Sequence, residues 1–536
     1  MTDERADSRS RSPARTARVL SDVRLLHELT KHGNGHQTHD DRLVLFRRLD
    51  PSNRPAPFKH YLGLPICPLP EDLPVPDEKA TEILSGRPAQ AEGVLDDRAL
   101  ARLLFLAAGI TRVARPPAPA EPIYFRAAMS AGNLHPVELY VVCGELPGIP
   151  AGVYHFAPAE FGLTMVRRGD FRPALVGAAG EASVASSPAT LVLTGLPWRT
   201  GWKYGERGYR HLYWDAGAVL ANLLAAADAG GVPVRVLAGF VDAQVCRLVG
   251  VDGTSEFPLA LAVIGRGQEP AAPDTAPPVD PLDLEMAPLS PRPVTFPLVI
   301  DAQQAGALES PDAVASWRQA AGGDAPVGSP VPLPASPDTG RLDEVALQRG
   351  STRLMRRAPV SRDVLEWGLA VAARPLPGDV DSGALVGHHV SVHDVDGVAA
   401  GAYRWRAGSL DVVRTGDFRD HTEHLCLDQP LGGDAAFTVF HTTDLDGVVV
   451  RLGARGYRAV HLAAGVAAGR LALAAFALGG GASGITFFDN EVARFFSTRE
   501  SCLLATAVGA PAYRNRAGGH PRAPAELTRL RHPRFR

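Results

Sequence analysis

The sequence predicts an α+β protein in which one fold occurs twice in tandem. Residues 205–217 read GERGYRHLYWDAG and residues 453–465 read GARGYRAVHLAAG, so one motif recurs 248 positions later. At 536 residues the chain is too long for one hydrophobic core, and two domains of roughly 200 residues are expected from size. Strand-like and helix-like segments also alternate around each copy of the motif. We therefore expect two related domains.

Two segments, residues 1–20 and 21–80, precede the first copy of the fold. Residues 1–20 are rich in Arg, Ser and Asp and are predicted to be a disordered tail. Residues 21–80 are predicted to wrap another surface, because a short helical pattern is followed by a Pro-punctuated run that cannot be regular helix. Domain 1 is predicted over residues 81–266. Its expected helices span 96–109 and 213–229, and its expected strands span 137–142, 190–194 and 259–264.

The second copy follows a Pro-rich segment. Residues 267–340 are crowded with Pro, Ala, Asp and Gly, a composition typical of a linker that runs extended over a surface. Domain 2 is predicted over residues 341–516, and residues 517–536 are predicted to be a basic C-terminal tail. The expected strands of domain 2 span 390–392, 437–441 and 503–508, and its long helix spans 457–478.

Composition argues against several kinds of partner. The formal net charge is −3 with mixed signs, so nucleic acid is not an expected ligand. Five cysteines lie far apart without CxxC spacing, which favours reduced thiols in a cytoplasmic protein over disulfides, zinc or metal catalysis. The longest apolar stretch, residues 459–485, is rich in Ala and Gly and contains His461 and Arg470. It predicts a buried helix and no membrane span.

Two polar clusters suggest ligand binding. Residues 349–353 (RGSTR) combine two guanidinium groups with two hydroxyls, which suits a phosphate, although a solvated basic turn explains them too. Residues 129–136 (MSAGNLHP) lead into a predicted strand. Small side chains there let a flat ligand approach the backbone, and Asn133 offers a donor and an acceptor. A tight structural turn is the alternative.

A third cluster suggests proton transfer. Lys203 and Tyr204 stand just before the first copy of the motif, whereas Val450-Arg451-Leu452 stands before the second. The pair can move protons only if burial or a neighbouring cation lowers pKa values that are ordinarily about 10.4 and about 10. The alternative is a lysine whose stem covers apolar surface beside a tyrosine at the edge of the core.

These motifs together resemble the nitroreductase superfamily of FMN enzymes and, within it, the SagB-type azoline dehydrogenases that form thiazoles and oxazoles in ribosomally made peptides. Residues 27–32 and 57–61 resemble the leader segment of long, tandem members. In domain 1 the resemblance follows the family's order through 108–112, 130–142, 151–155, 202–210 and 256–259. It implies a nitroreductase-like fold for both domains and FMN as the cofactor.

Domain 2 resembles the superfamily through different motifs. Residues 349–353 match its Arg-x-Ser-x-basic phosphate motif, residues 483–487 match the loop at the isoalloxazine edge, and two late arginines match a basic residue near the phosphate. The residues that the resemblance implies at FMN are Ser130, Ala131 and Asn133 of domain 1, and Arg349, Ser351, Arg353, Gly484, Ile485, Arg514 and Arg516 of domain 2.

Each domain lacks what the other keeps. In domain 1, residues 87–91 have lost the Ser and the second Arg of the phosphate motif, and in domain 2, residues 382–388 lack the Asn and Pro of the first copy. Superfamily dimers bind each flavin across their interface. The resemblance therefore implies an intramolecular pseudo-dimer that can act as a monomer, with one competent FMN site and an empty opposite site.

The activity implied is oxidation of thiazoline or oxazoline rings in a precursor peptide, with a cyclodehydratase as partner and dioxygen as final electron acceptor. Lys203 and Tyr204 match the family's Lys-Tyr pair and are the catalytic candidates, but the sequence leaves open which of them takes the proton. Two alternatives stand beside this hypothesis. One is an NAD(P)H-dependent nitro or quinone reductase, and the other is a flavin-binding scaffold that organises a peptide-modifying complex. The Lys-Tyr pair and the leader segment argue against the first, and the Lys-Tyr pair and the intact composite FMN site argue against the second.

Overall fold

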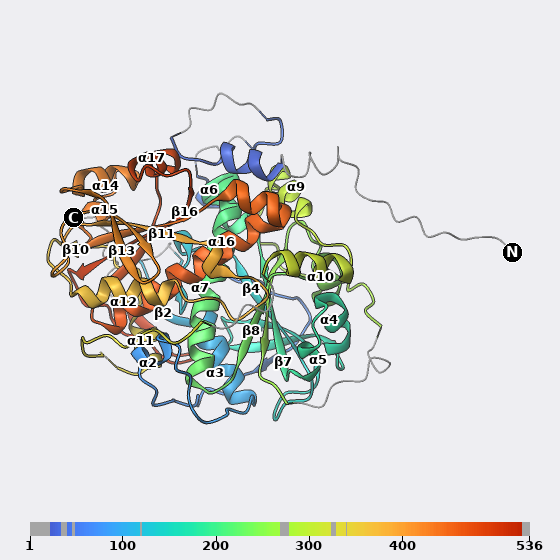
Figure 1. Ribbon diagram of the computed structural model, residues 1–536. Helices are drawn as coiled ribbons and strands as arrows, with labels where there is room; N and C mark the ends of the chain where they lie inside the picture. Colours follow the sequence, from blue (N-terminus) through green and yellow to red (C-terminus); the bar gives the residue numbers. More distant parts are fainter. Residues whose placement is uncertain are drawn as a thin grey trace.

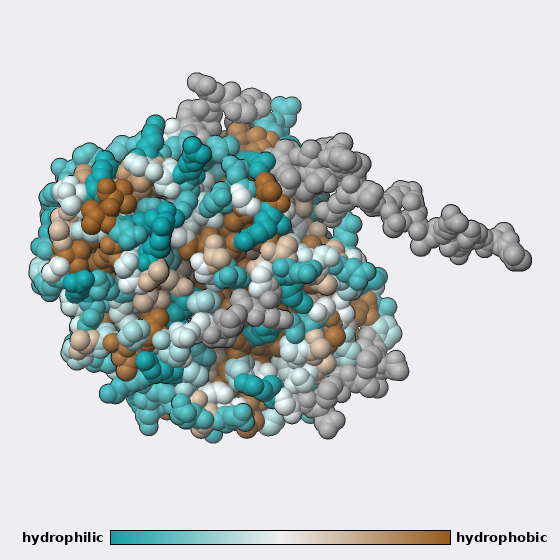
Figure 2. Space-filling model, in the orientation of Figure 1, coloured by the Kyte–Doolittle hydropathy of each residue, from teal (hydrophilic) through white to brown (hydrophobic). Residues whose placement is uncertain are grey.

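The computed structural model describes residues 22–33, 40–44, 49–117, 121–267, 278–322, 328–338 and 340–527. The tail predicted over residues 1–20 and the last residues of the chain lie outside this set. Figure 1 shows two lobes, with the first sheet on the right and the second on the left, and two long helices between them. On the face seen in Figure 2, hydrophilic and hydrophobic residues are intermixed.

The first lobe is built on a seven-stranded antiparallel sheet in the order β1-β6-β5-β4-β7-β9-β8. Its strands are β1 (Ile66–Pro68), β4 (Val137–Cys143), β5 (Gly152–Ala157), β6 (Gly162–Arg168), β7 (Ala189–Gly195), β8 (Val234–Leu237) and β9 (Phe257–Ile264). Its helices are α2 (Ala80–Leu84), α3 (Asp97–Ala108), α4 (Arg172–Ala179), α5 (Ser183–Ser186), α6 (Pro197–Tyr204), α7 (Gly208–Ala229) and α8 (Asp242–Val249), with 3-10 turns η1 (Pro51–Asn53), η2 (Ala131–Asn133) and η3 (Gly205–Arg207).

The second lobe repeats the order of six of these strands, from β6 to β8, whereas β1 in the first sheet and β10 in the second have no counterpart. Its antiparallel sheet runs β10-β16-β14-β11-β12-β13, with β15 paired to β16 as β8 is paired to β9. Its strands are β10 (Met355–Arg356), β11 (Gly387–Val392), β12 (Gly401–Arg406), β13 (Ser409–Thr415), β14 (Phe437–Thr443), β15 (Gly481–Ile485) and β16 (Ser501–Pro511). Its helices are α11 (Leu342–Gln348), α12 (Arg362–Ala372), α13 (Ser382–Leu385), α14 (Arg419–Leu425), α15 (Pro430–Asp434), α16 (Leu445–Ala477) and α17 (Asp489–Phe495). The prediction of one α+β fold in two tandem copies is confirmed.

The two lobes meet where α7 crosses α16, and small residues allow the close approach. A Cβ on Gly217 would lie 2.4 Å from the carbonyl oxygen of Leu462, and a Cβ on Gly465 would lie 2.4 Å from that of Trp214. Gly217 and Gly465 are the last residues of the two repeated motifs. The Ala-Gly ending of the repeat is therefore a packing requirement at the crossing of the two helices.

Helix α16 is long and apolar enough to cross a membrane by composition, but its most apolar window is wholly buried inside the protein. It packs against α7 and α12 in the centre of the molecule (Figure 1). The start predicted from the sequence, residue 457, was too late, because the helix already begins at Leu445 and passes a non-helical residue, Gly453, whose φ is 64°. The apolar length of α16 is explained by burial in the core.

The segment predicted to be an extended linker over 267–340 contains two helices, so that prediction was wrong in part. Helix α9 (Pro297–Ala305) and helix α10 (Pro311–Ala320) both start with Pro at the first turn, and Ser310 caps α10. Proline at that position suits a helix because the missing N–H has no intrahelical acceptor. The Pro-rich composition therefore concealed two helix starts.

Helix α9 is a second copy of the leader helix at residues 22–29. The arginines of each repeated motif donate to carbonyl groups at the end of one such helix: Arg207 to Thr30 and Arg210 to His27 in the first copy, and Arg455 to Gly306 and Arg458 to Gln303 in the second. The acceptors are separated by 276 positions in both cases. The duplicated unit therefore includes the leader as well as the α+β domain.

The predicted basic tail over 517–536 is also wrong in its described part. Strand β17 (Ala525–Leu527) pairs in parallel with β2 (Ile110–Ala114), which pairs with β3 (Ile123–Arg126), to form a small third sheet. The end of the second copy is thus tied to the first by backbone hydrogen bonds, which a pattern of basic side chains does not reveal.

Candidate active site

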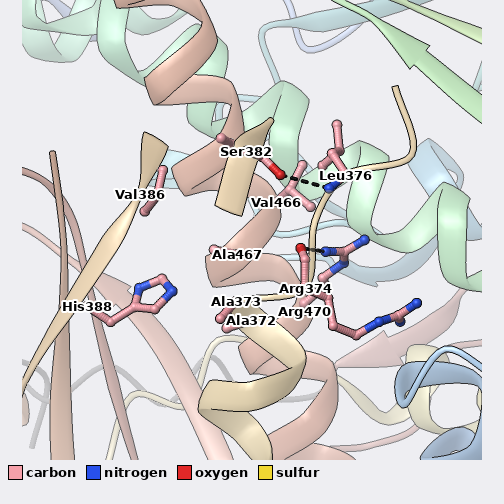
Figure 3. A pocket seen from close by; sticks show the side chains of 11 residues that line it. Ala372, Ala373, Arg374, Leu376, Ser382, Val386, His388, Val466, Ala467 and Arg470 are labelled. Carbon is pink, nitrogen blue, oxygen red and sulfur yellow. Dashed lines mark hydrogen bonds between the residues drawn. The ribbon is translucent and has the colours of Figure 1, made fainter. Parts of the chain in front are cut away.

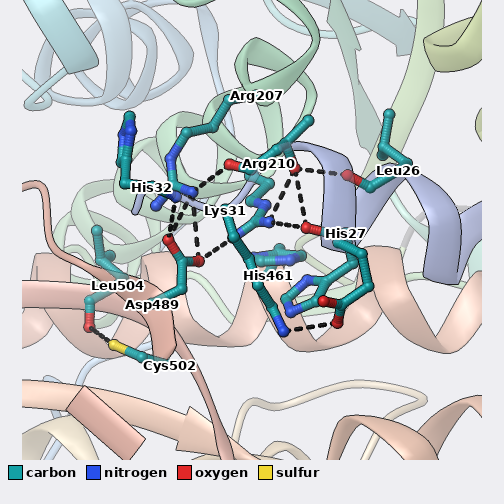
Figure 4. Close-up of polar contacts among 12 residues, drawn as sticks. Leu26, His27, Lys31, His32, Arg207, Arg210, His461, Asp489, Cys502 and Leu504 are labelled. Atoms are coloured by element: carbon teal, nitrogen blue, oxygen red, sulfur yellow. Dashed lines mark hydrogen bonds and ion pairs between the residues drawn. The ribbon is translucent and has the colours of Figure 1, made fainter. Parts of the chain in front are cut away.

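The repeated motif supplies an ion cluster that holds the two lobes together beside the candidate site. Asp489, the first residue of α17, accepts hydrogen bonds from Arg207 at 2.9 Å and from Arg210 at 2.7 Å, and all three side chains are buried (Figure 4). The backbone N–H of His32 in the leader also donates to Asp489, at 2.9 Å. This cluster fixes the start of α7, the helix that follows Lys203 and Tyr204.

The same cluster occurs at the related place in the other lobe. Asp242, the first residue of α8, accepts from Arg455 at 2.6 Å and from Arg458 at 2.7 Å, and the backbone N–H of Leu308 donates to it at 3.1 Å. The rings of Tyr209 and Tyr457 stack between the clusters with centroids 6.2 Å apart. The Arg-Gly-Tyr-Arg repeat in the sequence therefore specifies the pseudo-dimer interface.

Residues 130–135 of domain 1 form a strained loop with several left-handed residues. Gly132, Asn133 and His135 have φ values of 62°, 57° and 47°. Non-glycine residues in this region cost roughly 1–3 kcal/mol each and persist only where the surroundings hold them. The side chain of Asn133 donates to the carbonyl of Tyr124 at 2.8 Å and is 3.0 Å from the His135 ring nitrogen. Both polar groups of Asn133, predicted from sequence to face a ligand, are thus engaged with the protein itself: the amide nitrogen with β3 and the amide oxygen with the loop.

Asp215 of α7 holds the loop from below. Its carboxylate accepts from the hydroxyl of Ser130 at 2.5 Å and from the backbone N–H of Ala131 at 3.0 Å. The Ser130 hydroxyl in turn accepts from the N–H of His135 at 2.8 Å, which closes the loop. Burial raises the pKa of Asp215 to about 7, against the effect of these two hydrogen bonds.

Asp215 is a site residue that was not predicted from the sequence, although the repeat contains a signal for it. When the two motifs are aligned, Asp215 in the first occupies the same position as Ala463 in the second. A buried carboxyl that is present in one copy alone marks a difference in task between the copies, as the Lys-Tyr pair does. Asp215 also lines a small hollow under the loop, together with Arg126, Met129 and Val219.

Lys203 and Tyr204 lie against this loop at the end of α6. A Cβ on Gly132 would lie 2.7 Å from the Tyr204 hydroxyl oxygen and 3.2 Å from Lys203 Nζ, so glycine is needed for the contact. Burial, followed by the charges of Arg353 and Arg54, lowers the pKa of Lys203. Burial, followed by the charge of Asp215, raises the pKa of Tyr204. The structure thus brings domain 2's Arg353 within electrostatic reach of domain 1's catalytic candidates.

The remaining residues predicted in domain 2 lie along one edge of its sheet. Ser351 forms a backbone bridge with Ala482, next to Gly484 and Ile485. Arg349 is buried and donates to the carbonyl of Ala127, just before the strained loop. Gly484 is exposed, and a Cβ there would meet no described atom within 4 Å. Segments 127–135 and 349–353 therefore form a further contact between the lobes.

The two late arginines are arranged differently from each other. The side chain of Arg516 donates to the carbonyl of Glu526 in β17, while its own carbonyl accepts from Arg112 at 2.7 Å. Its guanidinium is therefore engaged with the C-terminal strand. Arg514 is exposed. Asn515 lies between them, and its carbonyl accepts from Gln348, the neighbour of Arg349. The backbone of this segment thus adjoins the predicted phosphate motif.

The corresponding loop of the second copy is built without its carboxyl support. Ala463 stands where Asp215 stands in the first copy and lines a hollow with Ala467 and Arg470. Figure 3 shows the hydroxyl of Ser382 directed at the backbone of Leu376, from which it accepts a hydrogen bond of 2.7 Å. The loop at 382–388, which lacks the Asn and Pro of the first copy, is therefore held by a different hydrogen bond, from Leu376 to Ser382.

The place in the other copy that corresponds to the candidate site, which we call the second crevice, is closed by the chain itself. Val236 donates to the carbonyl of Pro377 at 2.7 Å, which joins the two walls by a backbone hydrogen bond. The buried carboxylate of Asp379 accepts from the backbone N–H groups of Ala238 at 2.7 Å and Gly239 at 2.9 Å. Asp242 and Asp489 occupy related positions in the two copies. Counting back from them, Ala238 and Gly239 correspond to residues 485 and 486. Their N–H groups are thus already occupied by a side chain.

Helix α10 covers what is left of this crevice. The indole of Trp317 donates to the carbonyl of Leu452 at 3.0 Å, and Leu452 is the counterpart of Tyr204. The counterpart of the open residue Gly484 is Leu237, which is fully buried. The two places therefore differ in exposure: Gly484, at the edge of the one beside Lys203, is exposed, whereas Leu237, at the related position of the other, is buried.

The comparisons with known proteins agree with this architecture. Residues 74–266 match the model of the nitroreductase family. An inferred nitroreductase of Methanocaldococcus jannaschii is 27% identical over 170 residues, which cover 32% of this chain and 80% of the relative. A crystal structure of an inferred nitroreductase from Anabaena variabilis superposes with a TM-score of 0.68 at 24% identity, covering 91% of this chain and 99% of that one.

A further solved structure is the E. coli microcin synthetase McbBCD complex with truncated pro-MccB17 bound. One of its chains is 20% identical and superposes with a TM-score of 0.29, covering 47% of this chain and 94% of that one. The Anabaena likeness shows the fold of nearly the whole chain. Residues 74–266 therefore match the nitroreductase family, and both lobes of the protein have the nitroreductase fold.

Proposed function

We propose that the protein is an FMN-dependent dehydrogenase that oxidises thiazoline or oxazoline rings to thiazoles or oxazoles in a ribosomally made peptide. The observation that carries the proposal is the meeting of Lys203 and Tyr204, the loop at 130–135 and Arg353 at one place between the lobes. One lobe supplies the acid–base pair and the other supplies the cations. This is the division that the resemblance to SagB-type azoline dehydrogenases implies.

The residues of the composite site fit FMN. Arg349 is buried, and its Nε has no hydrogen-bond partner among the described residues, which suits a site that gains an anionic acceptor. Burial, followed by the charge of Arg112, lowers the pKa of Arg349 to about 9. A bound phosphate would supply the negative charge that this buried guanidinium lacks. Arg353 and Ser351 are the further phosphate candidates, and the open edge at Gly484 leaves room for a flat ring system. When bound, FMN would supply the hydride acceptor.

The pKa directions divide the proton-transfer work between the two catalytic candidates. Azoline oxidation removes a proton from the ring carbon that bears the peptide backbone and a hydride from the adjacent ring carbon. A lowered pKa makes Lys203 available as a neutral amine, so we assign it the proton. A raised pKa keeps Tyr204 protonated, so its hydroxyl can donate a hydrogen bond to negative charge that develops on the substrate.

The closed second crevice supports a single FMN per chain. Asp379 occupies backbone donors there, and Trp317 fills the space beside Leu452. Because the pseudo-dimer already supplies both halves of the open site, a second copy of the chain is not needed to complete it. The azoline substrate requires a cyclodehydratase to form it, and we propose such an enzyme as the partner.

The test compares variants at related positions of the two lobes. Lys203→Ala and Tyr204→Phe are expected to purify with FMN, and Lys203→Ala should lower the turnover of an azoline-containing peptide by about 10²–10⁴-fold. The matched control is Arg451→Ala, because Arg451 is the exposed counterpart of Lys203 in the closed lobe. Full azoline oxidation by Lys203→Ala would refute the catalytic assignment. Turnover-competent reduction of the flavin by NADPH alone would favour the nitro or quinone reductase alternative.

A further inference from the structure

Asp215 is a buried carboxyl group beside the candidate site, and none of the motifs discussed so far assigns it a role. Its side chain is 5% exposed and carries hydrogen bonds to Ser130 and Ala131 at 2.5 and 3.0 Å. Among the described residues, no cation contributes to the pKa of Asp215. Burial of a carboxyl without a cation is costly, and here the two hydrogen bonds from the loop are the contacts that offset the cost.

The loop that Asp215 anchors is the surface against which the catalytic candidates lie. Asn133 and His135 adopt left-handed backbone conformations that the chain holds only under constraint. Ser130 receives the N–H of His135 and passes its own hydroxyl hydrogen to Asp215, so a single carboxyl secures both ends of the turn. The middle of the turn, Gly132, is the residue that contacts Tyr204 and Lys203.

The second copy provides a natural contrast. There the carboxyl is replaced by Ala463, the loop hydroxyl of Ser382 bonds to Leu376, and the Lys-Tyr pair is replaced by Arg451 and Leu452. The carboxyl and the pair are therefore present together in the open lobe and missing together in the closed lobe.

We propose that Asp215 is a positioning residue for the dehydrogenase reaction, which holds Ser130 and Ala131 so that Gly132 keeps Lys203 and Tyr204 in their reactive arrangement. The inference rests on the proposed function and adds a residue that acts through the loop, without touching the substrate. The carboxyl also faces Tyr204 closely enough for its charge to oppose ionisation of that hydroxyl.

The test uses the full chain with FMN bound and separates positioning from folding. Asp215→Ala should keep its FMN content and the KM for an azoline peptide within about twofold, while kcat falls by roughly 10²-fold, as expected of a misplaced catalytic group. Asp215→Asn should recover most of the loss, because the carboxamide oxygen can still accept from Ala131 and its nitrogen can donate to Ser130. The visible circular dichroism of the bound flavin should change in Asp215→Ala and return in Asp215→Asn.

A double variant identifies the route of the effect. If Asp215 acts through Lys203, then Lys203→Ala combined with Asp215→Ala should be no slower than Lys203→Ala alone by more than about twofold. The proposal is overturned if Asp215→Ala keeps its full kcat, if its loss of kcat follows loss of FMN, or if the two losses multiply. A wild-type enzyme that does not oxidise azolines refutes the proposed function instead, and the flavin spectra of the Asp215 variants then decide the positioning claim by themselves.

Discussion

Replacing Asp489 by Asn should destabilise the protein strongly, because one carboxylate neutralises two buried arginines. Asp489 accepts from Arg207 and Arg210 at 2.7–2.9 Å, and their other acceptors are neutral groups of the leader, chiefly the carbonyls of Thr30 and His27. Removing one partner of a buried ion pair costs about 3–5 kcal/mol. Because two cations are left unpaired, we expect about 5 kcal/mol, a large part of the 5–15 kcal/mol typical of a folded protein.

The loss should depend on pH in a defined direction. Burial alone would raise the pKa of Asp489, but the charges of Arg210 and Arg207 lower it below its ordinary 3.8. A carboxyl with a depressed folded-state pKa stabilises the protein above its unfolded-state pKa, and this contribution disappears as the pH falls through the lower folded-state value. The difference in unfolding free energy between wild type and Asp489→Asn should therefore be constant at neutral pH and shrink below about pH 4.

Urea titration followed by tryptophan fluorescence measures this difference, and the related cluster supplies the control. Asp242→Asn leaves Arg455 and Arg458 unpaired in the same geometry, so it should cost a similar free energy. At a temperature where both variants are folded, Asp489→Asn should lose more activity, because its cluster fixes the start of α7 behind Lys203. A stability loss below about 1 kcal/mol, or one that persists unchanged at pH 3, would refute this account of the cluster.

Three further outcomes are expected. Flavin absorbance against protein concentration should give one FMN per chain, and a ratio near two would contradict the closed second crevice. Arg349→Ala and Arg353→Ala should retain less FMN on gel filtration, whereas Arg87→Ala, in the degraded motif of the other lobe, should retain as much as wild type; equal retention in all three variants would refute the phosphate assignment. Azoline oxidation should rise with pH as Lys203 loses its proton, with a midpoint below 10.5 that is absent in Lys203→Ala.

Much of the fold could be predicted from the sequence because the duplicated interface constrains the same residues twice. Arg207 and Arg210 and their counterparts must each reach an aspartate in the opposite lobe, and Gly217 and Gly465 must each allow a helix to pass. Such contacts require the same residue types in both copies, so the repeat can be recognised in the sequence. Hydrophobic periodicity likewise located central strands of both sheets (β4, β7, β9, β11, β14 and β16) and the long helices α3, α7 and α16, since burial on one face acts on residues that are near in sequence.

Other features depend on contacts between distant residues that leave little pattern in the sequence. The second leader was hidden in a Pro-rich segment because Gln303 and Gly306 bind arginines through backbone carbonyls, which any residue type provides. The closure of the second crevice likewise depends on Asp379 meeting backbone N–H groups about 140 positions away.

For the site, the sequence by itself determined which chemical groups are available, and the tertiary structure decided which of them work together. Lys203, Tyr204 and the arginine motif are recognisable as residue types in order. That burial, followed by the charge of Arg353 from the other lobe, lowers the pKa of Lys203, and that Asp215 anchors the loop beside it, follows from the folded arrangement of the chain. Electrostatic and hydrogen-bond energies depend on distances through space and on burial, and only the folded chain sets those distances.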